Sequence, residues 1–350
     1  MNQMNIVVLA GGTSTERAIS IVSGTEICKA LRQKGHRAVL TDVFGGAGNV
    51  DPADPFPAEY DVKTAAEYMK TFDSRIDEIR KSRKSFFGPG VLELCQKADI
   101  CFLALHGANG EDGKLQAAFD LMGIRYTGTG YLSSAMAMDK GITKKMFRLG
   151  NVPCPDGFSI RKGEDADLEK HGMSLPVVVK TCCGGSSVGV YIVHDPDEYR
   201  DALEKAFAYE DEVVVEEYIK GREFSVAVVD GKAFPVIEIR PLKGFYDYHN
   251  KYAPGSTIET CPAEIPADLT EKMQRIAEAG ARALEMEAYC RLDFMMRDNG
   301  DMYCLEANTL PGMTPTSLIP QEAKALGIEF PELCEMLMEI SLRRYKEADV

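Results

Sequence analysis

The most constraining feature of this chain is a pair of β-prone runs separated by a turn sequence near its C-terminal end. The first run is Tyr289–Met296 (YCRLDFMM) and the second is Met302–Asn308 (MYCLEAN), with Asn299-Gly300 between them. Asn-Gly between two apolar runs is typical of a two-residue type I′ hairpin turn. Such a turn fixes the register, because the numbers of facing residues then sum to 599.

This register places four polar side chains on one face of the hairpin. Asp293 falls opposite Glu306 and Arg291 opposite Asn308, and residues two apart in a strand share a face. Two carboxylates and a carboxamide on one surface repel one another or stay unpaired unless a cation is bound. Hard oxygen donors suit Mg²⁺, which commonly bridges protein carboxylates and nucleotide phosphates. The alternative is an exposed hairpin with cross-strand salt bridges.

Length and composition indicate a multidomain globular protein. The 350 residues exceed what one ordinary core accommodates, so two or three domains are expected, and 45% of the residues are apolar. No apolar run reaches membrane-spanning length, and the N-terminal MNQMNIVVLAGG lacks the basic region and cleavage site of a signal peptide. The ten cysteines have no zinc-like spacing and are typical of buried thiols in a reducing cytosol. We expect a cytoplasmic protein without a membrane partner.

The net charge argues against a nucleic-acid partner. It is −14, and the sequence has no basic stripe. A nucleotide remains compatible with this charge, because a few local cations can hold it.

The order of predicted elements indicates an α/β fold that becomes α+β in its later, catalytic part. Residues 4–10 form an apolar strand that ends in Gly11-Gly12, a helical pattern runs from 16 to 33, and 39–43 is the next strand, so the chain opens as a βαβ unit with a parallel sheet. Further strands are expected at 98–105, 176–180, 188–193 and 212–217, and further helices at 62–84, 115–122, 133–149, 197–209, 268–285 and 331–346.

A glycine-rich loop follows the strand at 176–180. Lys180 ends this strand, and the loop Thr181–Gly189 contains three glycines and two serines. Glycines let backbone N–H groups turn toward a bound anion, and serines add donors. The loop has no Walker A pattern. It is either a flap over phosphates or a flexible hairpin loop.

Acidic residues lie at the end of the strand at 212–217 and shortly after it. Acceptors at Glu216, Glu217 and Glu223 can hold an adenine amino group and ribose hydroxyls. The alternative is an ordinary edge strand with solvated charges, which is the commoner case for an isolated acidic run.

Two loops after parallel strands carry further candidate residues. Glu16 lies after the first strand, at the carboxyl edge where α/β sheets bind ligands, and its carboxylate suits an ammonium group. A capping box with Thr13 is the structural alternative. His106 follows another strand at the same edge and is either a site residue or a structural hydrogen-bond donor. Residues 243–256, which include Lys251, are long enough to form a lid or merely a surface loop.

Eight motifs follow one another along nearly the whole chain. They are GGTSTE (11–16), HGANGEDGKLQ (106–116), MDK (138–140), VVVKTCCGGSSVG (177–189), EEYIKGREFS (216–225), YDYHNKY (246–252), RLD (291–293) and LEANTLPGMTPTSL (305–318). In this order they resemble the D-alanine–D-alanine ligase family of ATP-grasp enzymes. The resemblance implies a three-domain ATP-grasp architecture, with a Rossmann-like parallel-sheet domain at 1–128, a central subdomain at 129–215 and a C-terminal subdomain at 216–350 that carries the metal and oxyanion sites. It also implies that ATP binds between the second and third domains.

The resemblance implies ligation of two D-alanines with ATP through an acyl phosphate, for peptidoglycan precursor synthesis, in a homodimer. D-alanine–D-serine or D-alanine–D-lactate ligation and a catalytically silent nucleotide sensor are the alternatives. The resemblance implies that Lys140 and Lys180 contact the phosphates of ATP. It implies that Glu216, Tyr218 and Ile219 hold the adenine and that Glu223 holds the ribose. It also implies that Asp293, Glu306 and Asn308 hold two Mg²⁺ ions, with Mn²⁺ as a substitute. It further implies that Glu16, Ser186, Tyr252 and His106 serve the first D-alanine, Arg291 and Gly312 the oxyanion, and Lys251, Ser317 and Leu318 the second D-alanine.

The chain departs from the family pattern at three places. Glu217 stands where members often carry lysine, and Cys182-Cys183 in the flap is unusual. Residues 45–90 form a longer stretch than in compact members, which indicates extra surface structure or an oligomer contact.

Overall fold

The computed structural model of the protein describes residues 2–185, 188–242, 244 and 255–347. The chain divides into two compact units. Unit 1 consists of residues 1–134, 286–290 and 309–350, and unit 2 of residues 135–285 and 291–308. Among the described residues, no helix is both long enough and apolar enough to cross a membrane.

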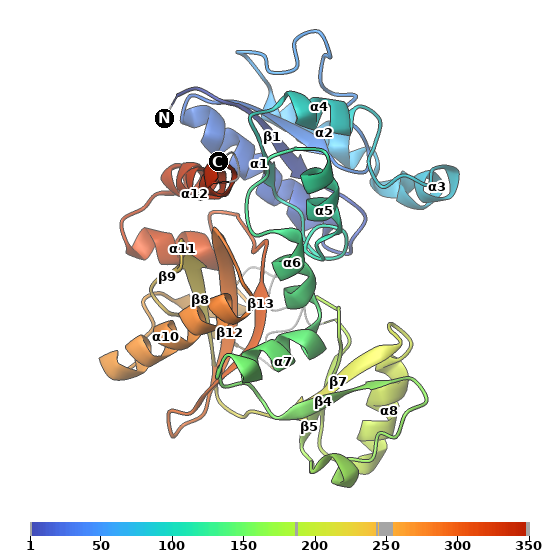
Figure 1. Ribbon diagram of the computed structural model, residues 1–350, viewed down its shortest axis with the longest axis vertical. Helices are drawn as coiled ribbons and strands as arrows, with labels where there is room; N and C mark the ends of the chain where they lie inside the picture. The colour runs from blue at the N-terminus through green and yellow to red at the C-terminus, as the bar shows by residue number, and fades with distance from the viewer. Residues whose placement is uncertain (1, 186–187, 243, 245–254, 348–350) are drawn as a thin grey trace. The chain divides into compact units, whose positions relative to one another are not determined.

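Unit 1 is built on the expected parallel sheet. Strand β1 (Asn5–Ala10) lies between β2 (Arg37–Asp42) and β3 (Ile100–Leu103), and both pairings are parallel. The strands are almost fully buried, which explains their continuous apolar sequences. Helix α1 (Arg17–Gln33) packs on β1 and β2, and α12 (Phe330–Glu347) lies beside α1 (Figure 1). The remaining helices of this unit are α2 (Val62–Lys70), α3 (Ile76–Ser82), α4 (Val91–Lys97), α5 (Lys114–Leu121) and α11 (Leu318–Ala325), with a 3₁₀ turn at Asp73–Arg75.

The helical pattern expected at 62–84 is divided into α2, the 3₁₀ turn and α3. This segment binds the first loop of the sheet through Arg17, whose guanidinium donates to the Met69 carbonyl at 2.8 Å and pairs with Asp73 at 2.8 Å. Arg80 donates to the Thr13 carbonyl at 3.2 Å. The longer stretch therefore braces the loop that carries Glu16.

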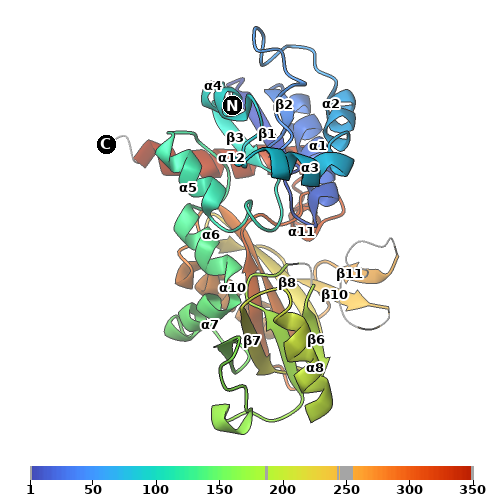
Figure 2. The same ribbon diagram turned by 90° about the vertical axis from the view of Figure 1, so that its right-hand side faces the viewer.

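Unit 2 contains a four-stranded antiparallel sheet in the order β4-β7-β5-β6. Its strands are β4 (Gly157–Arg161), β5 (Val177–Thr181), β6 (Val190–Val193) and β7 (Glu212–Glu217). Helix α8 (Pro196–Ala206) packs on β5 and β6, and Figure 2 shows it beside β6. Asp195 caps α8 by accepting from the N–H groups of Asp197 and Glu198.

The helical pattern expected at 133–149 is two helices, α6 (Tyr131–Met138) and α7 (Lys140–Leu149). The break falls at Asp139, whose side chain accepts from the Ile142 N–H and caps α7. This break starts α7 at Lys140, so Lys140 lies in its first turn.

A second sheet in unit 2 carries the hairpin. Its order is β11-β10-β8-β12-β13, with the short β9 (Lys232–Ala233) paired to β8. The strands are β8 (Arg222–Val229), β10 (Ile237–Pro241), β11 (Thr257–Thr260), β12 (Tyr289–Met296) and β13 (Met302–Asn308), and α10 (Ala267–Ala283) packs against β8, β9 and β13.

The predicted register at the hairpin face is confirmed, but the predicted turn is wrong. Arg291 faces Asn308 and Asp293 faces Glu306. The turn is a three-residue loop, because the Arg297 N–H donates to the Asp301 carbonyl and the Gly300 N–H to the Arg297 carbonyl, with Gly300 at φ +84°. This loop shifts the register by one residue, and a β-bulge at Leu305 shifts it back, because Phe294 faces Cys304.

Candidate active site

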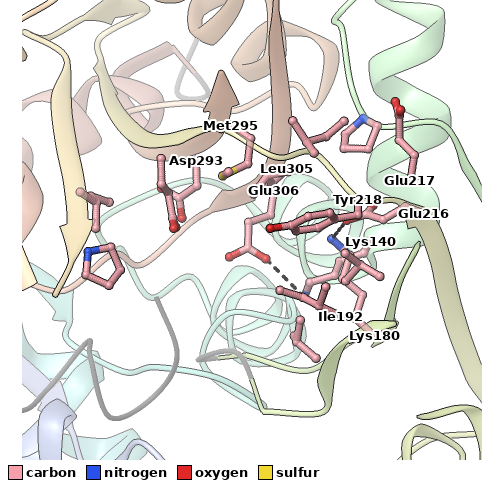
Figure 3. A pocket seen from close by; sticks show the side chains of 18 of the residues that line it. Lys140, Lys180, Ile192, Glu216, Glu217, Tyr218, Asp293, Met295, Leu305 and Glu306 are labelled. Carbon is pink, nitrogen blue, oxygen red and sulfur yellow. Dashed lines mark ion pairs between the residues drawn. The ribbon is translucent and has the colours of Figure 1, made fainter. Parts of the chain in front are cut away.

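A cavity of about 420 Å³ lies in unit 2. Among the described residues that line it are members of β5, β6, β7, β8, β10, β12, β13 and the start of α7, so both sheets of the unit contribute. Figure 3 shows the basic residues of its wall near Glu216 and the acidic hairpin residues opposite. Eight of the predicted nucleotide and metal residues line this cavity: Lys140, Lys180, Glu216, Tyr218, Ile219, Glu223, Asp293 and Glu306.

Two lysines hold the carboxylate of Glu216. Glu216 is on β7 and is buried, and Lys144 Nζ donates to its Oε2 at 2.6 Å. Lys180 Nζ pairs with its Oε1. Burial alone raises the pKa of Glu216, but the charges of Lys180 and Lys144 together hold that pKa below its ordinary value. The group is therefore ionised and surrounded by excess positive charge.

Lys140 connects the flap to the acidic hairpin. Its Nζ donates to the Gly184 carbonyl at 2.5 Å and lies 3.5 Å from Glu306 Oε2, the ion pair drawn in Figure 3. The side chain of Lys140 is buried. It is thus well placed to meet an anion that enters the cavity.

Asp293 is saturated by protein donors. Its Oδ1 accepts from Ser225 Oγ at 2.8 Å and from Arg291 Nε at 2.9 Å. Its Oδ2 accepts from Arg291 Nη2 at 2.8 Å and from Asn308 Nδ2 at 3.0 Å. The hairpin acids are therefore neutralised by Arg291 and Lys140, so the expectation that they repel or stay unpaired without a bound cation is wrong.

The donor set nevertheless fits a divalent ion. Asp293, Glu306 and Asn308 together offer carboxylate and amide oxygens, which are hard ligands. Because four donors already occupy the Asp293 carboxylate, an ion bound there displaces at least one of them. No group of three His, Cys, Asp or Glu side chains arranged for a metal occurs within the described part of the chain.

The other end of the cavity is partly apolar. Ile219 and Met295 contribute apolar surface, and Leu305 joins them because the bulge turns Leu305 and Glu306 toward the same space. Glu217 is paired with Arg297 at 2.8 Å. The cavity wall combines apolar surface, acidic acceptors and two buried lysines, Lys140 and Lys180.

Unit 1 holds two of the residues predicted for the first D-alanine, Glu16 and His106. Helix α1 begins at Arg17 with Glu16 as its N-cap residue, so the alternative capping box between Thr13 and Glu16 is wrong. A methyl group built on Gly107 lies 3.2 Å from Glu16 Oε2, which shows how closely the loops after β1 and β3 approach each other. The two loops meet at the carboxyl edge of the sheet, as predicted.

His106 is hydrogen-bonded to the loop that contains Gly312. The carbonyl of Leu310 can only accept, so the Nδ1 of His106, 3.0 Å away, carries the proton. The Nε2 of the same ring faces Ser23 Oγ at 3.3 Å. Glu111, which the sequence analysis did not select, accepts from the Leu310 N–H at 3.3 Å.

The remaining predicted residues of unit 1 lie at the start of α11. Ser317 Oγ accepts from the Thr314 N–H at 3.0 Å, and a methyl group built on Gly312 lies 3.0 Å from that oxygen. Leu318 is buried. Gly312 and Ser317 are therefore neighbours within one loop. Ser186, Lys251 and Tyr252 lie outside the described residues, as does most of the predicted lid at 243–256.

Lys144 was also missed from the sequence. Its signal was its spacing, because Lys140 and Lys144 are four residues apart and lie one turn apart on α7.

Comparison with known proteins decides the family. A model described as "D-ala D-ala ligase N-terminus" matches residues 5–129, and one described as "D-ala D-ala ligase C-terminus" matches residues 156–339. The chain belongs to the D-alanine–D-alanine ligase family. A D-alanine–D-alanine ligase of Pediococcus pentosaceus is 43% identical over 350 residues, which are 98% of this chain and 99% of the relative.

Solved structures of the family have the same fold. The D-alanine–D-alanine ligase of Bacillus anthracis is 37% identical with a TM-score of 0.76, over 99% of both chains. A structure of the Bacillus anthracis ligase complexed with ATP is 34% identical with a TM-score of 0.75, again over 99% of both chains. The predicted ATP-grasp fold class, with its N-terminal parallel sheet, is confirmed.

Proposed function

We propose that this protein joins two D-alanine molecules to D-alanyl-D-alanine at the expense of ATP, for peptidoglycan precursor synthesis. The observation that carries the proposal is the cavity of unit 2 whose wall includes Lys140, Lys180, Asp293 and Glu306. Lysines together with carboxylates that can bind a metal suit a nucleoside triphosphate. A relative of similar fold was crystallised in complex with ATP.

The chemistry begins with activation of a carboxylate. The oxygen of the first D-alanine carboxylate attacks the γ-phosphorus of ATP, which gives an acyl phosphate and releases ADP. The amine of the second D-alanine then attacks the carbonyl carbon, loses a proton, and expels inorganic phosphate as the peptide bond forms. Positioning and charge neutralisation dominate such a reaction.

The residues of unit 2 bind the nucleotide in this proposal. Lys140 and Lys180 contact the phosphates. Glu216 accepts from the adenine amino group, Tyr218 and Ile219 line the adenine pocket, and Glu223 binds the ribose. Asp293, Glu306 and Asn308 hold two Mg²⁺ ions, or Mn²⁺, which neutralise charge on the transferring phosphoryl group when bound.

The proposal assigns further residues to the two amino acids. Glu16 orients the ammonium of the first D-alanine, with Ser186 and Tyr252 hydrogen-bonded in the same network and His106 nearby. Lys251 and Ser317 receive the carboxylate of the second, and Leu318 packs on its methyl group. Arg291 and the N–H of Gly312 stabilise the oxyanion of the tetrahedral intermediate.

We further propose the three-domain division at 128/129 and 215/216, a homodimer and a cytoplasmic location. The two sheets of unit 2 support a division of that unit into two subdomains.

Phosphate release from Mg·ATP tests the proposal. We expect release that requires D-alanine, with D-alanyl-D-alanine as the product. Competition with D-serine and D-lactate then measures the choice of second substrate. ATP binding without D-alanine-dependent release would instead identify a nucleotide sensor.

A further inference from the structure

The cluster of Lys144, Glu216 and Lys180 carries more cations than anions in a buried place. The three residues are only 4%, 3% and 6% exposed. One carboxylate meets two ammonium groups, through Lys144 Nζ on Oε2 at 2.6 Å and Lys180 Nζ on Oε1. Removing a charge from water costs free energy. The second buried lysine therefore calls for an explanation, because one lysine is enough to neutralise Glu216.

The two lysines differ in their access to the cavity. Among the residues that the structure describes, the cavity lining includes Lys180 and Glu216 but not Lys144. Lys180 comes from the end of β5, next to the flap, whereas Lys144 comes from the interior of α7. A ligand in the cavity can therefore attract Lys180 away from Glu216, while Lys144 stays behind the carboxylate.

Lys180 can leave Glu216 without a large loss of free energy only if Glu216 keeps another cation beside it. Breaking a buried ion pair and leaving one charge uncompensated is strongly destabilising. With Lys144 still hydrogen-bonded to Oε2, Glu216 remains paired after Lys180 turns toward an anion. Without Lys144, every contact of Lys180 with a phosphate leaves the buried carboxylate of Glu216 without a cation, because the adenine amino group is a neutral donor.

We propose that Lys144 is a positioning residue that frees Lys180 for the phosphates of ATP by holding the charge of Glu216. This inference rests on the proposed function, because it takes ATP as the ligand of the cavity. Lys144 itself touches neither the nucleotide nor the reacting atoms.

The test compares ATP with adenosine, which has the same base and ribose but no phosphate. Calorimetry with Mg²⁺ and without D-alanine gives the Kd of each ligand for the wild type and for Lys144→Met. We expect Lys144→Met to raise the Kd of ATP at least about tenfold, or about 1.4 kcal/mol, and that of adenosine by less than about threefold. A general loss of structure would raise the Kd of ATP and the Kd of adenosine by the same factor.

Two further variants serve as controls. Lys145→Met removes the same charge from the exposed face of the same helix and should leave both Kd values unchanged. Lys144→Arg keeps the charge and should restore ATP binding to within about threefold of wild type. If Lys144→Met does not fold, Lys144→Gln replaces it, since its amide still donates to Glu216 without a charge.

The outcomes are distinct. Equal weakening of ATP and adenosine, or equal effects of Lys144→Met and Lys145→Met, overturns the role of Lys144. An unchanged Kd of ATP in Lys144→Met overturns it as well and leaves the proposed function intact. Failure of the wild type to bind ATP at all counts against the proposed function itself.

Discussion

At the scale of single residues, the site is a set of charges that neutralise one another without a ligand. Arg291 neutralises Asp293, Lys140 faces Glu306, and Glu216 is held by Lys144 and Lys180. Each proposed contact with ATP or metal therefore exchanges one partner for another. This exchange keeps the buried charges paired both before and after binding, so no buried charge is left uncompensated in either state.

Arg291 has two tasks in this account, and its replacement tests the catalytic one. Arg291→Ala should lower kcat roughly 10²–10³-fold, about 3–4 kcal/mol, because an oxyanion donor is lost. Because Arg291 also binds Asp293, the Mg²⁺ titration of the variant is measured alongside. Turnover near the wild-type rate would refute the oxyanion role.

The pH dependence of stability reports on Glu216. Its pKa lies below the ordinary value of 4.5 because the two lysines outweigh burial. Its ion pairs therefore stabilise the fold fully above pH 4.5, and this stabilisation is lost as the pH falls through the lowered pKa. Glu216→Gln should cost about 3–5 kcal/mol at pH 7, measured by urea unfolding. We expect this difference in unfolding free energy between the wild type and the variant to become smaller as the pH falls below 4.5. A difference that does not change with pH would contradict the proposed ion pairing of Glu216.

At the scale of elements, two irregularities of the hairpin compensate each other. The three-residue loop displaces the register by one, and the bulge at Leu305 restores it, so Asp293 still faces Glu306. The facing pairs were predictable because polar residues recur at every second position. The bulge was not, since its signal is tertiary: it turns Leu305 toward the cavity against the alternation of the strand.

The bulge makes a specific prediction about nucleotide binding. Leu305 lines the cavity only because it shares a side with Glu306. Leu305→Ala should raise the KM for ATP about tenfold through lost apolar contact, worth about 1–2 kcal/mol, while the KM for D-alanine changes little. Steady-state kinetics with each substrate varied separately measures both values. A rise for D-alanine alone would place Leu305 in a different pocket.

At the scale of the whole molecule, the sequence predicted most of the architecture. Apolar strands such as β1 and β3 were recognised because they are buried on both faces, and the loops after them meet as predicted. The breaks at Asp139 and within 62–82 were missed, because capping and docking against other elements override a continuous helical pattern. The spacing of Lys140 and Lys144 indicates a shared helix face, but it does not reveal the pairing of Lys144 with Glu216, which is 72 residues away in the sequence.

Ligand binding should stabilise the whole molecule in a metal-dependent way. At a concentration about 100 times its Kd, ATP adds roughly 2.7 kcal/mol of stability by mass action. We expect the corresponding rise in Tm with Mg²⁺ and a much smaller rise with EDTA. Glu306→Gln should require more Mg²⁺ for the same rise, and an unchanged Mg²⁺ titration would count against the metal assignment.

The most direct test follows oxygen atoms through the reaction. D-alanine labelled with ¹⁸O in its carboxylate is incubated with the protein and Mg·ATP, and the released phosphate is analysed by mass spectrometry. Because the attacking carboxylate oxygen leaves with the phosphoryl group, we predict one ¹⁸O in each phosphate and one D-alanyl-D-alanine per phosphate. Unlabelled phosphate, or labelled phosphate without dipeptide, would contradict ligation through an acyl phosphate.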